Sequence, residues 1–142
     1  MILVIQTTIS GRISVWLVKA RKILAEQTKT VEWHGSDQAV ACVDRTLRSI
    51  KKTLADVTGS VVVRGPGSFT AVRTGIIIAN TLSKALNVPV RGLVAKNPLS
   101  KINVLHQAAI SGMKNSAVKP WYGKKPNISK PKLRRFQAKA KR

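Results

Sequence analysis

The stretch from Phe69 to Leu86 constrains the fold of this chain more than any other part of it. Apolar residues recur there at helical spacing, and clear boundary signals stand on both sides. The turn cluster 65–68 (Gly-Pro-Gly-Ser) precedes the stretch and ends on a good N-cap residue, Ser68. Asn87 is a suitable C-cap, and Pro89 prevents the helix from continuing. The pattern predicts one long helix over 69–86 that packs on a sheet.

Short aliphatic and β-branched runs predict the strands of that sheet. A second amphipathic helix is predicted over 37–54, because apolar residues follow the capping pair Ser36-Asp37 at spacings of three and four. The resulting order is β-β-β-α-β-α-β, in which a meander leads into strands joined through helices. This order predicts an α/β fold with a mixed five-stranded sheet. The five strand runs are residues 1–5, 13–18, 23–30, 60–63 and 88–93.

Charge divides the chain into unequal parts. Residues 1–100 carry fourteen basic and all five acidic residues, whereas residues 101–142 carry twelve basic residues and no acidic one. Apolar periodicity also fades toward the C-terminus. We therefore expect three parts, which are a folded lobe (1–95), a connecting helix (96–113) and an extended basic tail (114–142). The tail is expected to bind nucleic acid and to be disordered when free.

The remaining composition argues against several classes of protein. Cys42 is the only cysteine, so no intramolecular disulfide can form, and a reducing, cytoplasmic location is expected. With His34 and His106 as the only histidines, we expect no metal site and no cofactor. The uncharged apolar stretch 74–83 is too short to cross a bilayer, and the N-terminal residues do not predict a signal peptide or a membrane partner. The carboxylates show no catalytic spacing, so the chain alone is not expected to be an enzyme.

The loop and first turn at residues 65–75, GPGSFTAVRTG, carry a family resemblance. They resemble the GPGSFTG(L/V)RxG signature of the TsaB (YeaZ) family. The opening MILVIQTTISGRISVWLV is similar to that family's ILxIDTS strand and the hairpin after it. The segments 33–36 (WHGS) and 85–90 (ALNVPV) also fit its pattern. The resemblance covers residues 1–95.

This resemblance implies a single lobe of the actin-like ATPase (ribonuclease H-like) fold. It also implies a scaffold, since TsaB is a non-catalytic relative of TsaD and the two pair through helices of their N-terminal lobes. With TsaE, that complex adds a threonylcarbamoyl group to adenosine 37 of tRNAs. Four departures stand out. Gln6 replaces a common Asp, which argues further against metal or nucleotide chemistry, and Ala71 replaces a Gly. Residues 96–142 are expected to be too few and too basic to form the family's second lobe. The basic C-terminal tail is itself foreign to the family.

The two main helices are the expected binding surface for a TsaD-like subunit. Ile76, Ile77 and Ile78 follow one another and must point in different directions, so one of them faces either a partner or another part of the lobe. The candidate partner-binding residues are Val40, Val43, Leu47, Phe69, Val72, Ile76 and Ile77.

The loop before the second main helix has two interpretations. Gly65, Gly67 and Ser68, with Arg73 nearby, could hold an anion at the helix N-terminus. Alternatively, the loop is a tight turn in which Ser68 caps the helix. The sequence contains no GK[ST], which excludes a Walker loop.

The basic tail is the expected contact for RNA. Positive charge binds phosphate through counterion release, and interleaved aromatic residues can stack on unpaired bases. The candidate residues are Lys119, Trp121, Tyr122, Lys124, Lys125, Lys130, Lys132, Arg134, Arg135, Phe136, Lys139, Lys141 and Arg142.

Two functions fit these observations. The first is a non-catalytic scaffold that pairs with a TsaD-like subunit and contacts tRNA through its tail. The second is a lobe repurposed to bind ribosomal RNA as a structural or assembly component of the ribosome. The motif in residues 65–75 favours the first, and the net charge of +21 is compatible with both.

Overall fold

A computed structural model of the chain describes residues 1–32, 35–108 and 113–123. The predicted order of elements, β-β-β-α-β-α-β followed by a further helix, is confirmed. The elements are β1 (Ile2–Gln6), β2 (Arg12–Lys19), β3 (Lys22–Thr30), α1 (Gly35–Ser49), the short 3-10 helix η1 (Leu54–Asp56), β4 (Gly59–Val63), α2 (Phe69–Leu86), β5 (Val90–Leu93) and α3 (Lys101–Gln107).

The sheet is mixed and five-stranded, as predicted, with the strand order β3-β2-β1-β4-β5. β1, β2 and β3 form an antiparallel meander, and β4 and β5 add in parallel on the other side of β1. The turn between β2 and β3 places Ala20 and Arg21 at positive φ, which suits the twist of a two-residue hairpin. The sheet therefore changes from antiparallel to parallel pairing at β1.

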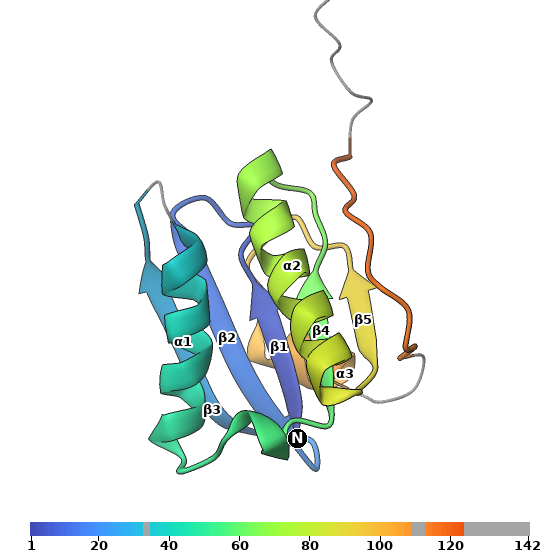
Figure 1. Cartoon of the computed structure of the whole chain (residues 1–142). Coiled ribbons are helices and arrows are strands. Elements are labelled where there is room, and N and C mark those ends of the chain that lie inside the picture. The colour runs from blue at the N-terminus through green and yellow to red at the C-terminus, as the bar shows by residue number, and fades with distance from the viewer. Residues whose placement is uncertain (33–34, 109–112, 124–142) are drawn as a thin grey trace, which may run out of the picture.

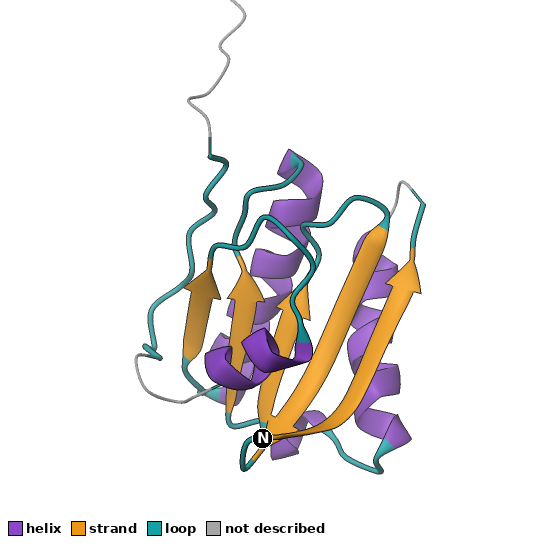
Figure 2. Cartoon of the chain, turned by 180° about the vertical axis from the view of Figure 1, so that it is seen from behind, coloured by secondary structure: helices purple, strands orange, loops and turns teal. Residues whose placement is uncertain are grey.

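Helices cover both faces of the sheet. α1 and α2 lie side by side on one face (Figure 1), and α3 lies on the other (Figure 2). Side chains alternate along β1 accordingly: Leu3 and Ile5 join the core under α1 and α2, whereas Ile2 and Val4 join the core that includes Val104 of α3. All five strand positions of β1 are buried, so β1 is the central strand of a three-layer lobe.

The two main helices match their predictions unequally. α2 spans the predicted residues, with Ser68 as N-cap and Asn87 as a left-handed C-cap. The prediction that the first main helix extends to residue 54 was wrong, because α1 ends at Ser49. Lys51 adopts a positive φ there, and the Lys52 N–H donates to the Leu47 carbonyl, which closes the helix in a Schellman-type turn.

The connecting helix is shorter than predicted. α3 covers only Lys101–Gln107 and begins at Ser100, whose side chain accepts a hydrogen bond from the Asn103 N–H. Residues 96–100 are not helical, and residues 109–112 lie outside the described part of the chain. The helical prediction for 96–113 is therefore confirmed for residues 101–107 and wrong for residues 96–100.

Residues 113–123, which we name the edge segment, pack against the lobe. Lys114 forms an antiparallel bridge with Val90, so the segment lies beside the edge strand β5 (Figure 1). The Asn80 side chain of α2 donates to the Val118 carbonyl at 3.0 Å and accepts from the Val118 N–H at 2.8 Å. The Trp121 N–H donates to the Arg64 carbonyl at 2.8 Å. Residues 114–123, which were predicted to be the start of a separate tail, therefore pack against the lobe.

Candidate functional site

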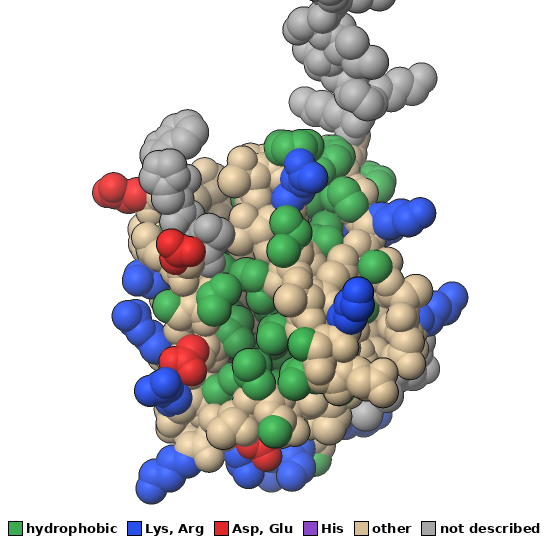
Figure 3. Space-filling model, viewed as in Figure 1, with side chains coloured by type: hydrophobic (Ala, Val, Ile, Leu, Met, Phe, Trp, Pro, Cys, Tyr) green, Lys and Arg blue, Asp and Glu red, His purple; other side chains and the backbone are tan. Residues whose placement is uncertain are grey.

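α1 and α2 present exposed apolar side chains on their outer surface. Val40 of α1 is 57% exposed, and Ile77 and Phe69 of α2 are 59% and 60% exposed. Hydrophobic side chains gather in a hollow between the two helices (Figure 3). Of the three consecutive isoleucines, Ile76 is buried, Ile78 is half-buried and Ile77 points outward. This face offers apolar surface that the described part of the chain does not cover.

Four of the predicted partner-binding residues lie inside the lobe instead. Val43, Leu47, Val72 and Ile76 are at most 5% exposed and belong to the core between the helices and the sheet. Helical periodicity marks the apolar stripe of a helix, and that stripe is the face that packs on the sheet. These residues hold the helices in place and cannot contact a partner directly.

The loop before α2 is a close-packed turn. The Ser68 Oγ accepts a hydrogen bond from the Ala71 N–H, as an N-cap does. A Cβ atom at Gly67 would lie 2.9 Å from the Thr8 carbonyl oxygen, and one at Gly65 would lie 1.7 Å from the Trp121 carbonyl oxygen. Both glycines are therefore required by the close approach of another backbone. Binding of an anion at this loop stays a prediction.

An aromatic stack joins the start of α2 to the edge segment. The rings of Phe69 and Tyr122 stack with their centroids 5.5 Å apart. The Arg73 guanidinium lies over the Phe69 ring, 4.7 Å from its centroid. Arg73, which was predicted to contact an anion, therefore packs on an aromatic ring. Tyr122, which was predicted to contact RNA, stacks one face of its ring on Phe69.

Gln6 occupies the end of β1 and is 2% exposed. Its side-chain amide donates to the Asn97 carbonyl and accepts from the Leu99 N–H, both at 2.9 Å. A carboxylate at this position could accept a hydrogen bond but could not donate one. The departure from Asp at this position therefore has a structural role, which is to hold residues 97–99 against the strand.

The pKa values of two described side chains, Cys42 and Asp56, are shifted from their ordinary values. Burial raises the pKa of the Cys42 thiol, which disfavours the reactive thiolate. The backbone hydrogen bond from Thr53 lowers the pKa of Asp56. Among the described residues, no three His, Cys, Asp or Glu side chains come together as a metal site would require, and no helix is long and apolar enough to cross a membrane. His34 lies outside the described residues.

The predicted RNA-binding residues fall partly within the described chain. Lys119 and Trp121 are exposed on the edge segment, and Tyr122 is half-buried. The other predicted residues lie outside the described part of the chain, and their contact with RNA stays a prediction. They are Lys124, Lys125, Lys130, Lys132, Arg134, Arg135, Phe136, Lys139, Lys141 and Arg142.

The structure also brings together basic residues that the sequence analysis did not group. Arg64, Arg91, Lys114 and Lys119 line one cavity of about 420 Å³ between β5 and the edge segment. They come from three separate parts of the chain, so no local motif could have shown them. The signal available in the sequence was the absence of acidic residues after Asp56.

Comparison with known proteins identifies the family. The family model described as "TsaD: tRNA N6-adenosine threonylcarbamoyltransferase" matches residues 23–113. The chain is 29% identical over 84 residues to "tRNA threonylcarbamoyladenosine biosynthesis protein TsaB" of Bacillus subtilis (strain 168), which is 59% of this chain and 37% of that protein. It is also 29% identical over 92 residues to the TsaB protein of Buchnera aphidicola subsp. Schizaphis graminum (strain Sg), covering 65% of this chain and 41% of that protein.

The chain belongs to the family of TsaD and TsaB (YeaZ) proteins. Solved structures agree. YeaZ from Pseudomonas aeruginosa matches with a TM-score of 0.60 and 26% identity, over 66% of this chain and 43% of that one. A protein described as similar to peptidase YeaZ, also from Pseudomonas aeruginosa, matches with a TM-score of 0.61 and 26% identity, over 66% of this chain and 42% of that one.

These matches confirm the predicted family and the α/β fold, with a sheet and helices arranged as in an actin-like lobe. The chain spans about two fifths of the length of the curated TsaB relatives it matches. The family match extends to Met113, so it includes α3, whose Val104 is part of the core on the other face of the sheet from α1 and α2.

Proposed function

We propose that this chain acts in tRNA threonylcarbamoyladenosine biosynthesis as a non-catalytic, partner-binding lobe, in the cytoplasm. Its partner is a TsaD-type subunit, which packs on the face formed by α1 and α2, and its basic C-terminal residues contact RNA. The carrying observation is the exposed apolar surface on these two helices, in a chain that belongs to the family. The curated relatives are themselves named for this biosynthesis.

Exposure and position support the proposed pairing surface. Val40 and Ile77 expose more than half of their surface on neighbouring helices, and Phe69 is the first residue of α2. Side chains contribute most to binding where they are fully desolvated near the centre of an interface. A partner that contributes its own helices would cover the hollow between α1 and α2.

Two of the described residues support the proposed non-catalytic role. The buried Cys42 thiol has a raised pKa, and Gln6 uses both amide groups within the chain. Neither group is available to a substrate. The lobe would therefore position and stabilise its partner, in which the reaction takes place.

The pairing is tested by mixing the full chain with the TsaD-type protein of the same organism and measuring the complex by sedimentation velocity and calorimetry. Ile77→Glu should weaken binding by at least about tenfold, because it places a charge at the centre of the proposed interface. Ile102→Glu is the matched control, since Ile102 is 69% exposed on α3, on the other face of the sheet. Equal affinity for both variants and the unchanged chain, or no complex at all, would contradict the proposal.

The RNA contact of the tail is tested by removing residues 124–142. The cut leaves the edge segment intact, so the lobe should stay folded and should pair with the TsaD-type protein as before. RNA binding should become markedly weaker, because nine of the twelve basic residues after position 100 are removed. If the truncated chain loses pairing, or if purification of the full chain recovers ribosomal RNA and ribosomal proteins without a TsaD-type subunit, the assignment is wrong.

A further inference from the structure

The acidic residues of the described chain lie on one side of the molecule, whereas basic residues lie on both sides. The five acidic residues all lie in or beside β3, α1 and η1. The part of the chain that forms β4, α2, β5 and the edge segment contains no acidic residue. On the face shown in Figure 3, acidic side chains accompany α1 and the lower end of the molecule, and only basic ones lie over α2 and the edge segment.

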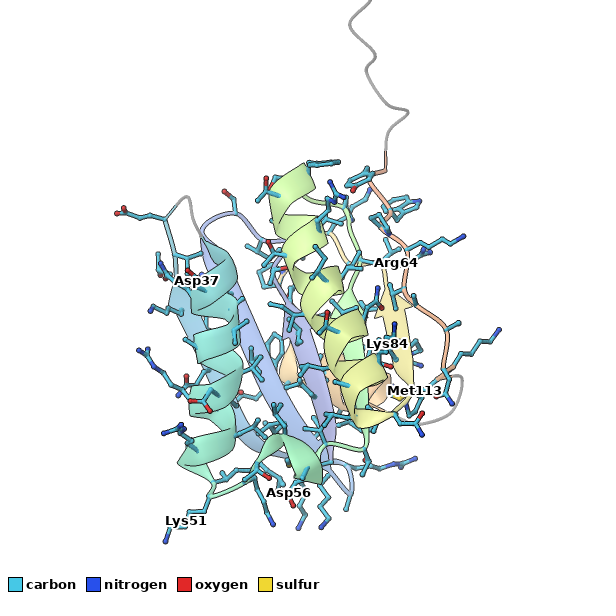
Figure 4. The ribbon with its side chains drawn as sticks, viewed as in Figure 1. Asp37, Lys51, Asp56, Arg64, Lys84 and Met113 are labelled. Carbon is cyan, nitrogen blue, oxygen red and sulfur yellow. The ribbon has the colours of Figure 1, made fainter. Side chains whose placement is uncertain are left out.

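A cavity opens within this acid-free side. It lies between β5 and the edge segment and has a volume of about 420 Å³. Four of its nine lining residues are basic, and none is acidic; the basic ones are Arg64, Arg91, Lys114 and Lys119. Figure 4 shows Arg64 beside the edge segment, on the opposite side of the molecule from Asp37.

Three of the four cations in this cavity, Arg64, Lys114 and Lys119, form no ion pair with the carboxylates that the structure describes. The described ion pairs use Arg48, Lys52 and Lys101, all outside the cavity. The Arg64 guanidinium donates to the Lys119 carbonyl at 3.4 Å, and Arg91 donates to the side chain and backbone of Gln107. The hydrogen bond of Arg64 to a backbone carbonyl orients its guanidinium group and leaves its positive charge in place.

The backbone of the cavity is fixed before any ligand arrives. Lys114 and Val90 exchange backbone hydrogen bonds at 2.9 and 3.4 Å, and the Asn80 amide holds Val118 through both of its polar groups. Gly92 allows this close packing, because a Cβ atom there would lie 2.6 Å from the Val118 side chain and 2.7 Å from that of Arg64. The residues that carry the positive charges therefore have fixed backbone positions along a groove.

We infer that the groove between β5 and the edge segment binds the phosphate backbone of RNA. Guanidinium groups match phosphate geometry in pairs of hydrogen bonds, and lysines add point charges to the same path. The chain continues from this groove into residues 124–142, which carry nine more basic residues and no acidic one. The inference rests on the RNA contact in the proposed function and adds a second binding site, on the folded lobe. This site would contact phosphates and would not distinguish one base sequence from another.

The test compares two variants of the full chain that lose the same charge. The groove variant is Arg64→Gln, Lys114→Gln and Lys119→Gln. The control is Lys22→Gln, Arg45→Gln and Lys51→Gln, which replaces exposed cations on the side that holds the acidic residues. Binding of a labelled RNA hairpin is measured by fluorescence anisotropy over a series of salt concentrations. The groove variant should bind more weakly, and the slope of log K against log salt should fall by about 2 to 3 units.

The control variant should keep the slope of the unchanged chain. Equal losses in both variants, or an unchanged slope in the groove variant, would overturn the inference. Lys114→Gln with Lys119→Gln, which keeps the Arg64 hydrogen bond, repeats the test if the triple variant is less stable, and its slope should fall by about 1.5 to 2 units.

Two further readouts separate the alternatives. Phosphatidylcholine vesicles containing phosphatidylserine test a membrane surface: loss of vesicle binding with full retention of RNA binding in the groove variant would overturn the RNA assignment. Pairing with the TsaD-type protein should be the same for the groove variant and the unchanged chain. If the unchanged chain does not pair but the slopes differ as expected, the proposed pairing fails and the groove stands. If pairing occurs and the slopes do not differ, only the groove fails.

Discussion

The two sides of the lobe hold their outer segments in different ways. Around α1 and η1, exposed ion pairs such as Arg48 with Asp44 join residues that are close in sequence. Around β1, α2 and β5, the side-chain amides of Gln6 and Asn80 hold segments that lie far away in sequence. An amide both donates and accepts without using a charge. This side can therefore fix its C-terminal segments and still present uncompensated positive charge.

Among the predicted substitutions, Gly65→Ala should have the largest effect on stability. It acts on the side of the lobe around β1, α2 and β5. Its Cβ atom would collide with the Trp121 carbonyl oxygen, and the residue has a φ of 138°. We expect a loss of at least about 2 kcal/mol in the free energy of unfolding, with faster proteolysis of the edge segment. Gly11→Ala is the matched control, because Gly11 also has a positive φ but its nearest foreign atom would lie 3.7 Å away. Equal losses in urea unfolding would show that the packing at Gly65 is not the cause.

Gln6→Glu should cost about 2 kcal/mol at neutral pH, because a buried carboxylate cannot donate to the Asn97 carbonyl. A protonated carboxyl can donate, so the pKa of the new side chain should be raised in the folded state. Its destabilisation should be small at low pH and should grow as the pH rises above about 4.3. Gln6→Met removes both hydrogen bonds without adding a charge, and its loss should not vary with pH. Parallel pH profiles for the two variants would contradict this account of Gln6.

The Phe69–Tyr122 stack should contribute about 1 kcal/mol of coupling between α2 and the edge segment. A double-mutant cycle with Phe69→Leu and Tyr122→Leu, followed by urea unfolding, measures it. As a control, a cycle between Phe69→Leu and Leu24→Ala should show no coupling, because Leu24 lies on a different element, β3. Strictly additive losses for the stacked pair would mean that the rings do not hold the end of the segment.

The smallest expected effect on stability is that of replacing Asp56, which lies on η1, on the side of the lobe with exposed ion pairs. The Thr53 N–H donates to its carboxylate at 2.9 Å and lowers the pKa of Asp56 in the folded state. The stabilisation is present above the ordinary Asp pKa of about 3.9 and is lost as the pH falls through the folded-state value. Asp56→Asn should therefore be less stable than the unchanged chain at neutral pH and should converge with it in acid. A difference in stability between the two chains that persists at low pH would show that the Asp56 carboxylate is not its cause.

Sequence patterns predicted those parts of the fold whose signals are local. α2 was predicted to the residue, because Ser68 and Asn87 mark its ends directly. The end of α1 was missed, because the left-handed turn at Lys51 contains neither Gly nor Pro. The order of elements and the mixed sheet followed from apolar runs and their spacing.

The candidate sites were predicted less well, because they depend on distant residues. Three consecutive isoleucines are alike in residue type, which alone does not show which of them faces outward, so Ile76 and Ile77 were grouped although only Ile77 is exposed. The position of the edge segment depends on the hydrogen bonds between Asn80 and Val118, which are 38 residues apart. No local pattern in residues 113–123 indicates that they pack against β5.

The central claim is that the lobe has two separate binding surfaces, an apolar one on α1 and α2 and a basic one beside β5. Hydroxyl-radical footprinting of the full chain, alone and with either the TsaD-type protein or RNA, tests it most directly. We predict that the protein protects Val40 and Ile77 and leaves Val118 unchanged, and that RNA protects Val118 and Trp121 and leaves Val40 unchanged. Protection of the same residues by both partners, or of neither surface by either partner, would contradict the account.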